Sequence, residues 1–376
     1  MSRRLLVVCN DLDFFLLHRL PETRGALREG YEVHVACPVG GRVQEVCAEG
    51  FVYHPLVLSR SGTNPFHELL AIVGLYRLFR SVQPDLTYLM TVKPILYGGI
   101  AARLAGVRAA VAAVFGLGFV FTDKRLATRL LRIMVSVLYR VALSHKNLRV
   151  IFQNPADRAL LVELGAVSKD KTVMIQGSGV DLQVFRVQAE PEGATVVVMA
   201  ARLLKDKGVR EYVEAARILK ADGVVARFLL AGDQDKGNPS SVSVAELDLW
   251  RQQGCVELLG YRKDMPALLS AAHVVVLPSY REGLPRVLEE AAACGRAVVT
   301  TDVPGCRDAI VAEVTGLLVP AREVPALARA IRRLIEDTEL RRQMGKSGRQ
   351  LAEKCYGVEK IVASHLAIYR ELLGNG

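Results

Sequence analysis

Strand-like runs that alternate with helix-length segments predict an α/β fold with two Rossmann-like domains facing each other across a cleft. Short apolar runs recur along the 376 residues, amphipathic stretches lie between them, and the polar segment 187–194 separates two similar halves. Runs that are apolar throughout are typical of parallel strands, because helices cover both faces of a parallel sheet. Such domains bind ligands beyond the carboxyl ends of their strands, so we expect the active site in the cleft.

The individual elements follow from the apolar runs. Strands are predicted near 4–9, 31–36, 51–57, 86–90, 109–114, 148–152 and 172–175, with the longest helix of this half near 124–145. Strands of the second half are predicted near 195–200, 226–231, 255–258, 273–277, 297–300 and 315–318. A Pro and a Gly without periodicity mark 187–194 as a linker. The predicted domains are therefore 1–187 and 195–357, and we expect a last helix, 358–373, to pack back on the first.

The composition and the length of the apolar runs argue against a membrane-spanning, a secreted or a metal-binding protein. The longest apolar run, 109–121, has 13 residues and two glycines, short of the ~18 that a membrane-spanning helix needs. The N-terminal segment has the pattern of a strand rather than of a signal peptide. The seven cysteines form no CxxC pair, which favours reduced, buried thiols and a cytoplasmic location. Scattered His and Cys residues indicate no metal site.

Positive charge is concentrated in the first half. Residues 1–190 hold 23 Lys and Arg against 15 Asp and Glu, a net +8, which leaves +2 of the total +10 for residues 191–376. A basic half suggests an anionic partner, namely a nucleic acid, a phospholipid surface or a diphosphate. An ordinary soluble basic surface would give the same count.

Two carboxylates stand out in 278–295, PSYREGLPRVLEEAAACG. Glu282 falls in the loop after a predicted strand, and Glu290 falls in the following helix, which Pro285 opens. Two carboxylates there can each accept hydrogen bonds from paired hydroxyls of a sugar or ribose, while the amides of Gly283 and Leu284 suit a phosphate. Acidic residues in the first turns of an ordinary helix would give the same pattern.

Two cations follow the strand predicted at 195–200. Arg202 and Lys207 lie in MAARLLKDKGV, before a helix predicted at 207–220. At the carboxyl end of a strand they are well placed for a diphosphate, which Arg binds with two parallel hydrogen bonds and Lys as a point charge. A surface loop with ordinary solubility charges is the alternative.

Together, these residues resemble the retaining glycosyltransferases of family 4, which have the GT-B fold. The similarity spans the chain and includes LAGDQD at 230–235, LLGYRKDMPALLSAAHVVVLPSYREGLP at 258–285 and TTDVPGCRDAI at 300–310. The resemblance implies that Arg202 and Lys207 bind the diphosphate of a nucleotide sugar, that Glu290 binds the ribose and that Glu282 contacts the transferred sugar. It makes Glu282, Arg202 and Lys207 the catalytic residues.

The first half is similar to bacterial enzymes that add N-acetylhexosamine to undecaprenyl-diphosphate-linked glycans. The similar pieces include FFLLHRLP at 14–21, TVKPILYGGIAARLAGV at 91–107 and FGLGFVFTD at 115–123. Many family 4 enzymes have a His after the strand corresponding to 109–114, where this chain has Phe115, Gly116, Leu117 and Gly118. No His there can be given a catalytic role, and the glycines suggest a close backbone approach to a ligand.

Other residues are candidates for the acceptor side of the site. The acceptor-side candidates are Asp11, His18, Arg19, Lys93, Gly116 and Gly118. The DxD patterns at 11–13 and 233–235 would hold a metal in a different transferase fold; because Arg202 and Lys207 supply positive charge, we interpret both as structural or acceptor-side. The basic amphipathic stretch 124–149 suits an anionic membrane leaflet, although a core-packed helix with a charged outer face is also possible.

These expectations combine into one reaction. A hexosyl or N-acetylhexosaminyl unit would pass, with retention, from a nucleotide sugar, expected to be UDP-linked, to a polyprenyl-diphosphate-linked or other envelope glycan. No cofactor and no nucleic acid is expected, and the enzyme would work in the cytoplasm, peripherally on the inner face of the membrane. The alternatives are a sugar-nucleotide epimerase of similar fold and a non-catalytic protein that binds anionic surfaces. A dinucleotide-dependent enzyme is excluded because no GxGxxG follows the first strand.

Overall fold

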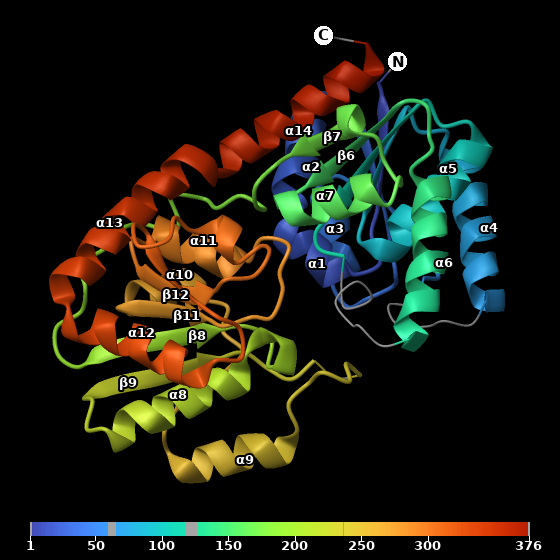
Figure 1. Ribbon diagram of the computed structural model, residues 1–376. Coiled ribbons are helices and arrows are strands. Elements are labelled where there is room, and N and C mark those ends of the chain that lie inside the picture. The colour runs from blue at the N-terminus through green and yellow to red at the C-terminus, as the bar shows by residue number, and fades with distance from the viewer. Residues whose placement is uncertain (1, 59–64, 118–125, 236, 375–376) are drawn as a thin grey trace. The chain divides into compact units, whose positions relative to one another are not determined.

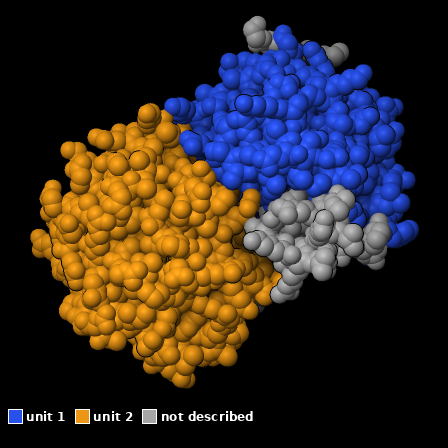
Figure 2. Space-filling view, viewed as in Figure 1, with its two compact units in different colours: residues 1–178, 359–376 blue, residues 179–358 orange. Residues whose placement is uncertain are grey.

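The chain forms two compact units. The computed structural model describes residues 2–58, 65–117, 126–235 and 237–374. Residues 1–178 and 359–376 make the first unit and residues 179–358 make the second, coloured blue and orange in Figure 2. The chain therefore crosses between the units twice, after Ser178 and again after Val358.

The segment 187–194 is not a linker in the structure. The side chain of Glu190 is 9% exposed and accepts hydrogen bonds from Nε and Nη2 of Arg341 at 2.9 and 3.0 Å. His273 Nε2 lies 3.0 Å from the carbonyl oxygen of Pro191. These contacts attach the segment to the second unit, so the first domain ends before residue 187 and the second begins before residue 195. Polar composition marked an irregular segment correctly but could not reveal its partners far along the chain.

The first unit is built on a sheet of seven parallel strands. The strands are β1 (Arg4–Val8), β2 (Glu32–Cys37), β3 (Val52–Pro55), β4 (Leu86–Met90), β5 (Ala109–Val114), β6 (Leu148–Phe152) and β7 (Thr172–Met174), in the order β3-β2-β1-β4-β5-β6-β7. All six residues of β5 are buried, as expected for a central strand that helices cover on both faces. The apolar runs of the sequence thus mark this sheet well.

Helices cover both faces of this sheet (Figure 1). Its helical elements are α1 (Leu12–His18), α2 (Leu20–Arg28), α3 (Val43–Ala48), α4 (Pro65–Val82), the π-helical turn η1 (Pro94–Gly98), α5 (Gly99–Ala105), α6 (Leu126–Ala142), α7 (Pro155–Glu163), the 3-10 turn η3 (Lys169–Lys171) and α14 (Val358–Leu373). One core joins the sheet to α4, α5, α6 and α7. The other joins it to α1, α2, α3 and α14. The last helix belongs to the first unit because its apolar residues, among them Ile361 and Tyr369, enter that core.

The second unit has a sheet of six parallel strands. The strands are β8 (Thr195–Ala200), β9 (Ala226–Ala231), β10 (Glu257–Gly260), β11 (Val274–Leu277), β12 (Ala297–Thr301) and β13 (Gly316–Val319), in the order β10-β9-β8-β11-β12-β13. Its helical elements are the 3-10 turns η4 (Lys205–Lys207) and η5 (Arg307–Ala309) and helices α8 (Val209–Ala221), α9 (Val244–Gln253), α10 (Met265–Ser270), α11 (Arg286–Ala293), α12 (Val324–Glu336) and α13 (Thr338–Cys355). A single core holds this unit together.

Strand order locates the place where a ligand would bind in each unit. In the first sheet the order reverses between β1 and β4, and in the second between β8 and β11. At such a point the connections on either side lead to opposite faces, which leaves a crevice beyond the carboxyl ends of the two strands. Arg202 and Lys207 follow β8 and Glu282 follows β11, so the fold brings these residues to the crevice of the second unit.

Composition predicted reduced, buried cysteines and no membrane-spanning helix. All seven cysteines are free thiols, five of them buried. In the part of the chain that the structure describes, no helix combines the length and apolarity needed to span a membrane.

Candidate functional site

Two loops beyond β8 and β11 are bound to each other through their backbones. Gly208, at φ +73°, lies so close to the carbonyl oxygen of Pro278 that a Cβ would collide with it. The amide of Tyr280 donates to the carbonyl of Asp206 at 2.9 Å. This contact holds turn η4, which carries Lys207, against the loop that carries Glu282.

Lys207 and Glu282 form an ion pair at this junction. The Nζ of Lys207 lies 2.5 Å from Oε1 of Glu282, and the two side chains are 20% and 11% exposed. The backbone of Glu282 is also held, because its amide donates to Pro304 O at 3.1 Å and its carbonyl lies against Gly305, where a Cβ would collide with it. Gly305 has a φ of +84°, a conformation that suits glycine. The pair is therefore rigidly placed and mostly shielded from water.

The hydroxyl of Ser279 contacts and orients the same Glu282 carboxylate. This contact was not predicted from the sequence. Its hydroxyl donates to Oε1 of Glu282 at 2.7 Å, and its side chain is fully buried. Thr301, at the end of β12, donates through its hydroxyl to the carbonyl oxygen of Ser279. The signal available in the sequence was a hydroxyl residue two positions after a buried strand, three residues before the glutamate.

Arg202 lies at the outer end of the site and pairs with a different carboxylate. Its Nη1 is 2.6 Å from Oδ2 of Asp235, and the arginine side chain is 51% exposed. The loop after β9 reaches Arg202 because the amide of Leu203 donates to Asp233 O at 2.9 Å. One acidic residue of the second DxD pattern is therefore the counter-ion of the arginine, which agrees with the structural interpretation of that pattern.

Glu290 is brought to a separate, buried position on α11. Its Oε1 accepts a hydrogen bond from Arg286 Nε at 2.8 Å, one turn earlier on the helix. Burial raises the pKa of this carboxyl, although Arg286 opposes the shift. The two glutamates of the motif have different partners: Lys207 and Ser279 for Glu282, and Arg286 for Glu290.

The two amides expected to face a phosphate precede this helix. Gly283 and Leu284 lie in the loop, Pro285 is the N-cap, and α11 begins at Arg286. The side chain of Leu284 is buried. The loop thus leads directly from Glu282 to the helix that carries Glu290.

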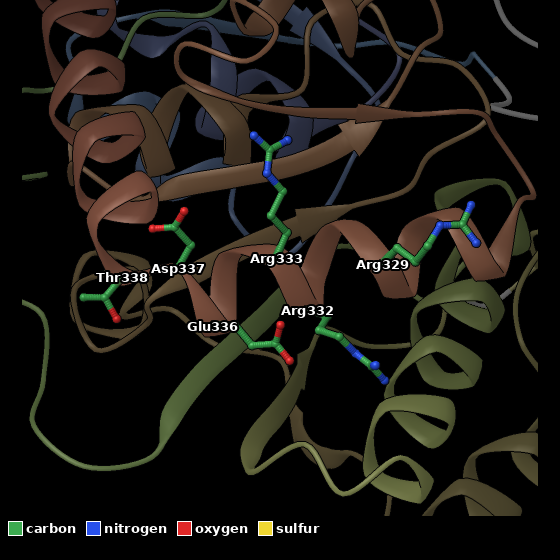
Figure 3. A pocket seen from close by; sticks show the side chains of 6 residues that line it. All are labelled: Arg329, Arg332, Arg333, Glu336, Asp337 and Thr338. Atoms are coloured by element: carbon green, nitrogen blue, oxygen red, sulfur yellow. The ribbon is translucent and has the colours of Figure 1, made fainter.

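Two hollows among the described residues of the second unit can be compared with the predicted site. One, of about 530 Å³, adjoins the carboxyl ends of β9 and β10 and is bordered by Leu203, Gly232 and Asp235, so it reaches the partner of Arg202. The other, of about 460 Å³, lies along the last turns of α12 and the start of α13 (Figure 3). Two arginines at the second hollow, Arg332 and Arg333, pair with Asp222 and Glu313. This surface of ion pairs has none of the predicted site residues.

Two residues that the sequence did not single out lie beyond the carboxyl ends of β1 and β4, where the first sheet reverses its order. Thr91, directly after β4, has a φ of +70°, which is strained for a β-branched residue. Its hydroxyl donates to Oδ1 of Asn10, two positions after the end of β1, at 2.7 Å. Both are polar residues at the carboxyl ends of neighbouring strands, which was the only sequence signal for them. Backbone strain at this position marks it as a second candidate binding point.

Three acceptor-side candidates have structural partners. Asp11 is the N-cap of α1 and accepts from the amide of Phe14 at 2.9 Å. Lys93 Nζ lies 2.6 Å from Oε1 of Glu68. The ring of His18 packs against that of Phe14, with ring centroids 4.7 Å apart.

Arg19 differs from the expectation because it is buried. Its guanidinium lies 3.1 Å from Glu22 Oε1 and 3.2 Å from the Ser178 hydroxyl, and it stacks on the ring of Phe115 at 3.6 Å from the centroid. These contacts place it in the interior of the first unit, where it supports the packing around Phe115. Gly116 has a φ of +116°, and Gly118 lies outside the described residues.

The basic stretch 124–149 is described only in part. Lys124 and Arg125 lie outside the described residues, and α6 starts at Leu126 with side chains described from residue 134. Tyr139 and Ala142 enter the core, whereas Met134 is more than half exposed. Within the described ranges, no group of three or more His, Cys, Asp or Glu side chains could hold a metal ion.

Known proteins similar to this chain are glycosyltransferases. Residues 182–351 match the family Glycosyl transferases group 1, and residues 5–154 match Glycosyl transferase 4-like. A Campylobacter jejuni protein named N,N'-diacetylbacillosaminyl-diphospho-undecaprenol alpha-1,3-N-acetylgalactosaminyltransferase is 30% identical, with 95% of this chain and 96% of that protein covered. The Escherichia coli UDP-Gal:alpha-D-GlcNAc-diphosphoundecaprenol alpha-1,3-galactosyltransferase is 25% identical, with 82% and 81% covered.

Solved structures agree on the fold. Anabaena HepE in complex with UDP and glucose superimposes with a TM-score of 0.78 at 19% identity, covering 97% of this chain and 99% of that one. WaaG, a glycosyltransferase involved in lipopolysaccharide biosynthesis, gives 0.73 at 15% identity, covering 95% and 98%. The two parallel-sheet units are thus those of the GT-B fold, and the chain belongs to the group 1 glycosyltransferases.

Proposed function

We propose that this enzyme transfers a hexosyl or N-acetylhexosaminyl group from a UDP-linked sugar to a hydroxyl of a polyprenyl-diphosphate-linked glycan, with retention of the anomeric configuration. The observation that carries the proposal is the Lys207–Glu282 ion pair, held at the point where the second sheet reverses its order. The names of the two relatives, both of which specify undecaprenol-diphosphate acceptors, support the choice of acceptor.

In the proposed reaction, Arg202 and Lys207 bind the diphosphate of the donor. In the free enzyme each cation is paired with a carboxylate, Asp235 and Glu282 respectively, so the donor diphosphate would compete with these carboxylates for the two cations. As the bond between the sugar C1 and the phosphate oxygen breaks, charge builds up on the leaving diphosphate, and the two cations stabilise it. Because the Lys207 side chain is mostly buried, solvent only weakly screens the charge of its ammonium group.

The two glutamates take separate roles in this proposal. Glu282, oriented by Ser279 and Lys207, faces the sugar and stabilises positive charge that develops on the ring. Glu290 accepts hydrogen bonds from the ribose hydroxyls. The acceptor oxygen forms the new bond to C1, its proton passes to the departing phosphate oxygen, and UDP leaves. We propose that neither a metal ion nor a cofactor is required, since the two cations supply the charge.

The acceptor would bind to the first unit. Asn10 and the strained Thr91 offer polar groups where its sheet reverses the order of its strands. The net charge of +8 on residues 1–190, 23 basic minus 15 acidic, favours a diphosphate-linked lipid and an anionic membrane surface. We place the enzyme in the cytoplasm, peripherally on the inner face of the membrane.

A donor screen tests this function. Purified enzyme is incubated with UDP-linked hexoses and N-acetylhexosamines and a short-chain polyprenyl-diphosphate glycan, and the product mass and UDP release are measured. We expect one donor to give a product heavier by one sugar residue, with UDP release that requires the acceptor. Coupling constants of the new anomeric proton report retention. Formation of an epimerised UDP-sugar without an acceptor would instead support the epimerase alternative, and no turnover with any donor would overturn the proposal.

A further inference from the structure

Tyr280, the third residue after β11, fastens the loop that carries Glu282 to helix α8. Its phenol donates to Oε1 of Glu211, in the first turn of α8, at 2.6 Å. Burial and the Glu211 carboxylate raise the pKa of Tyr280 to about 12, so the phenol keeps its proton near neutral pH and remains the donor. Hydrogen bonds to a carboxylate are stronger than those between neutral groups. This Tyr280–Glu211 bond therefore joins two segments that lie far apart in the sequence.

Two further contacts fix the position of Tyr280. Its backbone amide donates to the carbonyl of Asp206, in turn η4, at 2.9 Å. The guanidinium carbon of Arg322, in the turn after β13, lies 4.4 Å from the centroid of the Tyr280 ring, and Arg322 has a φ of +66°, which is uncommon for a residue other than glycine. Tyr280 is thus held by its amide at η4, by its hydroxyl at α8 and across its ring by the turn after β13.

The Glu211 carboxylate is unfavourable for stability alone. Its Oε2 is buried and has no hydrogen-bond partner among the described residues. Burying a carboxylate oxygen without a partner destabilises a fold, and a pair of apolar side chains of similar shape would avoid that loss. Polar groups that break this rule are expected at functional sites. The Tyr280–Glu211 bond is therefore better explained by what it positions than by the stability that it contributes.

Binding of the donor increases the importance of this bond. In the free enzyme the Glu282 carboxylate is contacted by Nζ of Lys207 and by the hydroxyl of Ser279. Because the donor diphosphate would compete for Lys207, Glu282 would have fewer side-chain contacts at the stage when the bond to the sugar breaks. The Tyr280–Glu211 bond involves neither Lys207 nor Glu282, so it persists through this exchange of partners.

We propose that Tyr280 is a positioning residue for sugar transfer, which holds Glu282 in place through Glu211 while the donor diphosphate occupies Lys207. The inference rests on the proposed function, because it requires Glu282 to face the transferred sugar. Removing the phenol hydroxyl would leave the backbone bond between Tyr280 and η4, which carries Lys207. The variant should therefore lose kcat rather than UDP affinity, since a small displacement of a catalytic group strongly lowers the rate.

The experiment compares Tyr280→Phe with Tyr212→Phe by steady-state kinetics, calorimetry with UDP and thermal melting. Tyr212 is the matched control, because its phenol bonds elsewhere in the second unit, to the carbonyls of Val197 and Leu229 at 2.9 and 3.0 Å. Tyr280→Phe should lower kcat about 10- to 100-fold and leave UDP affinity within about twofold of the wild type. Tyr212→Phe should lower the melting temperature but leave kcat within about twofold.

Two variants separate positioning from stability. Glu211→Gln keeps an acceptor oxygen for the phenol, so kcat should stay within about threefold of the wild type. Tyr280→Phe with Glu211→Leu removes both partners and leaves no buried carboxylate unpaired, so the melting temperature should return toward that of the wild type. Its kcat should remain as low as that of Tyr280→Phe. Recovery of kcat together with the melting temperature would assign the whole effect to stability and overturn the proposal.

Hydrogen exchange separates this inference from the proposed function. The amides of Tyr280 and Glu282 are both hydrogen-bonded. With UDP bound, they should exchange roughly tenfold faster in Tyr280→Phe than in the wild type, and no faster in Tyr212→Phe. This measurement needs neither acceptor nor turnover. Absence of transfer by the wild type would refute the proposed reaction, whereas unchanged exchange or an unchanged kcat in Tyr280→Phe would refute the positioning role alone.

Discussion

Replacing Lys207 with methionine tests the diphosphate site most directly. Methionine keeps much of the length and apolar surface of the lysine stem but removes the ammonium group. The change breaks the 2.5 Å contact to Glu282 Oε1 and leaves Ser279 as the remaining donor described for that oxygen. Two separate losses follow, one in the stability of the fold and one in the binding of the transition state.

The size of each loss follows from burial. Exposed ion pairs contribute about 0–1 kcal/mol, and breaking a fully buried pair costs about 3–5 kcal/mol. With side chains 20% and 11% exposed, the Lys207–Glu282 pair lies between these limits, and we expect a loss of roughly 1–3 kcal/mol in unfolding free energy. Loss of one charged hydrogen bond to the diphosphate should cost a further ~1.5–3 kcal/mol, which lowers kcat/KM for the donor roughly 10- to 150-fold.

The assay is steady-state kinetics with varied donor, together with UDP affinity by calorimetry and unfolding by denaturant. Lys205→Met is the matched control, because it removes the same charge from the same turn η4 and should leave kcat/KM within about twofold of the wild type. The double variant Lys207→Met with Glu282→Gln should lose less stability than the sum of the single variants, since the two groups interact directly. Wild-type kcat/KM and UDP affinity in the Lys207 variant would refute the diphosphate assignment.

Four further outcomes are expected. Glu290→Gln should raise the donor KM more than it lowers kcat, because the ribose is bound equally in the ground state and the transition state. Glu282→Gln should mainly lower kcat and leave UDP affinity nearly unchanged. A Glu282 variant that loses UDP affinity but keeps kcat would reverse the two assignments. Arg202→Ala should weaken UDP binding measured by calorimetry roughly 10- to 150-fold, and unaltered binding would remove it from the site. Burial raises the folded-state pKa of Glu290 above 4.5. The protonated carboxyl therefore contributes its full stabilisation of the fold below pH 4.5, and this stabilisation is lost as the pH rises through the folded-state pKa. The melting temperature of Glu290→Gln relative to wild type should therefore rise over that window, and a flat difference would contradict the effect of burial. Activity in EDTA should match activity in magnesium, and a complete loss that manganese restores would return attention to the DxD patterns.

Local sequence predicts the sheets because each strand is a short apolar run that must be buried. The predicted strands 109–114 and 148–152 coincide with β5 and β6, and 195–200 and 226–231 coincide with β8 and β9. The predicted strand limits were less accurate at the edge of the second sheet, where a strand was predicted at 255–258 and β10 is Glu257–Gly260. Edge strands are only partly buried, so their apolar signal is weaker.

The candidate site was predictable where residue type and position along a strand both pointed to it. Lys207 and Glu282 could be proposed because each follows an apolar run, and parallel strands end at one edge. Ser279 and Thr91 could not be separated from other hydroxyl residues of the chain. Their importance comes from a bond to Glu282 and from a strained backbone beside Asn10, both of which arise only when neighbouring strands meet.

The sequence by itself determined the two α/β units, the charge of the first half and the identity of the cations and carboxylates, since these depend on composition and on spacing within single segments. Tertiary structure alone decided that 187–194 packs on the second unit, that Arg19 is buried, and that Glu282 and Glu290 have different partners. The physical reason is the same in each case. Burial and pairing depend on groups that are distant along the chain and become neighbours only through the order of strands in the sheet.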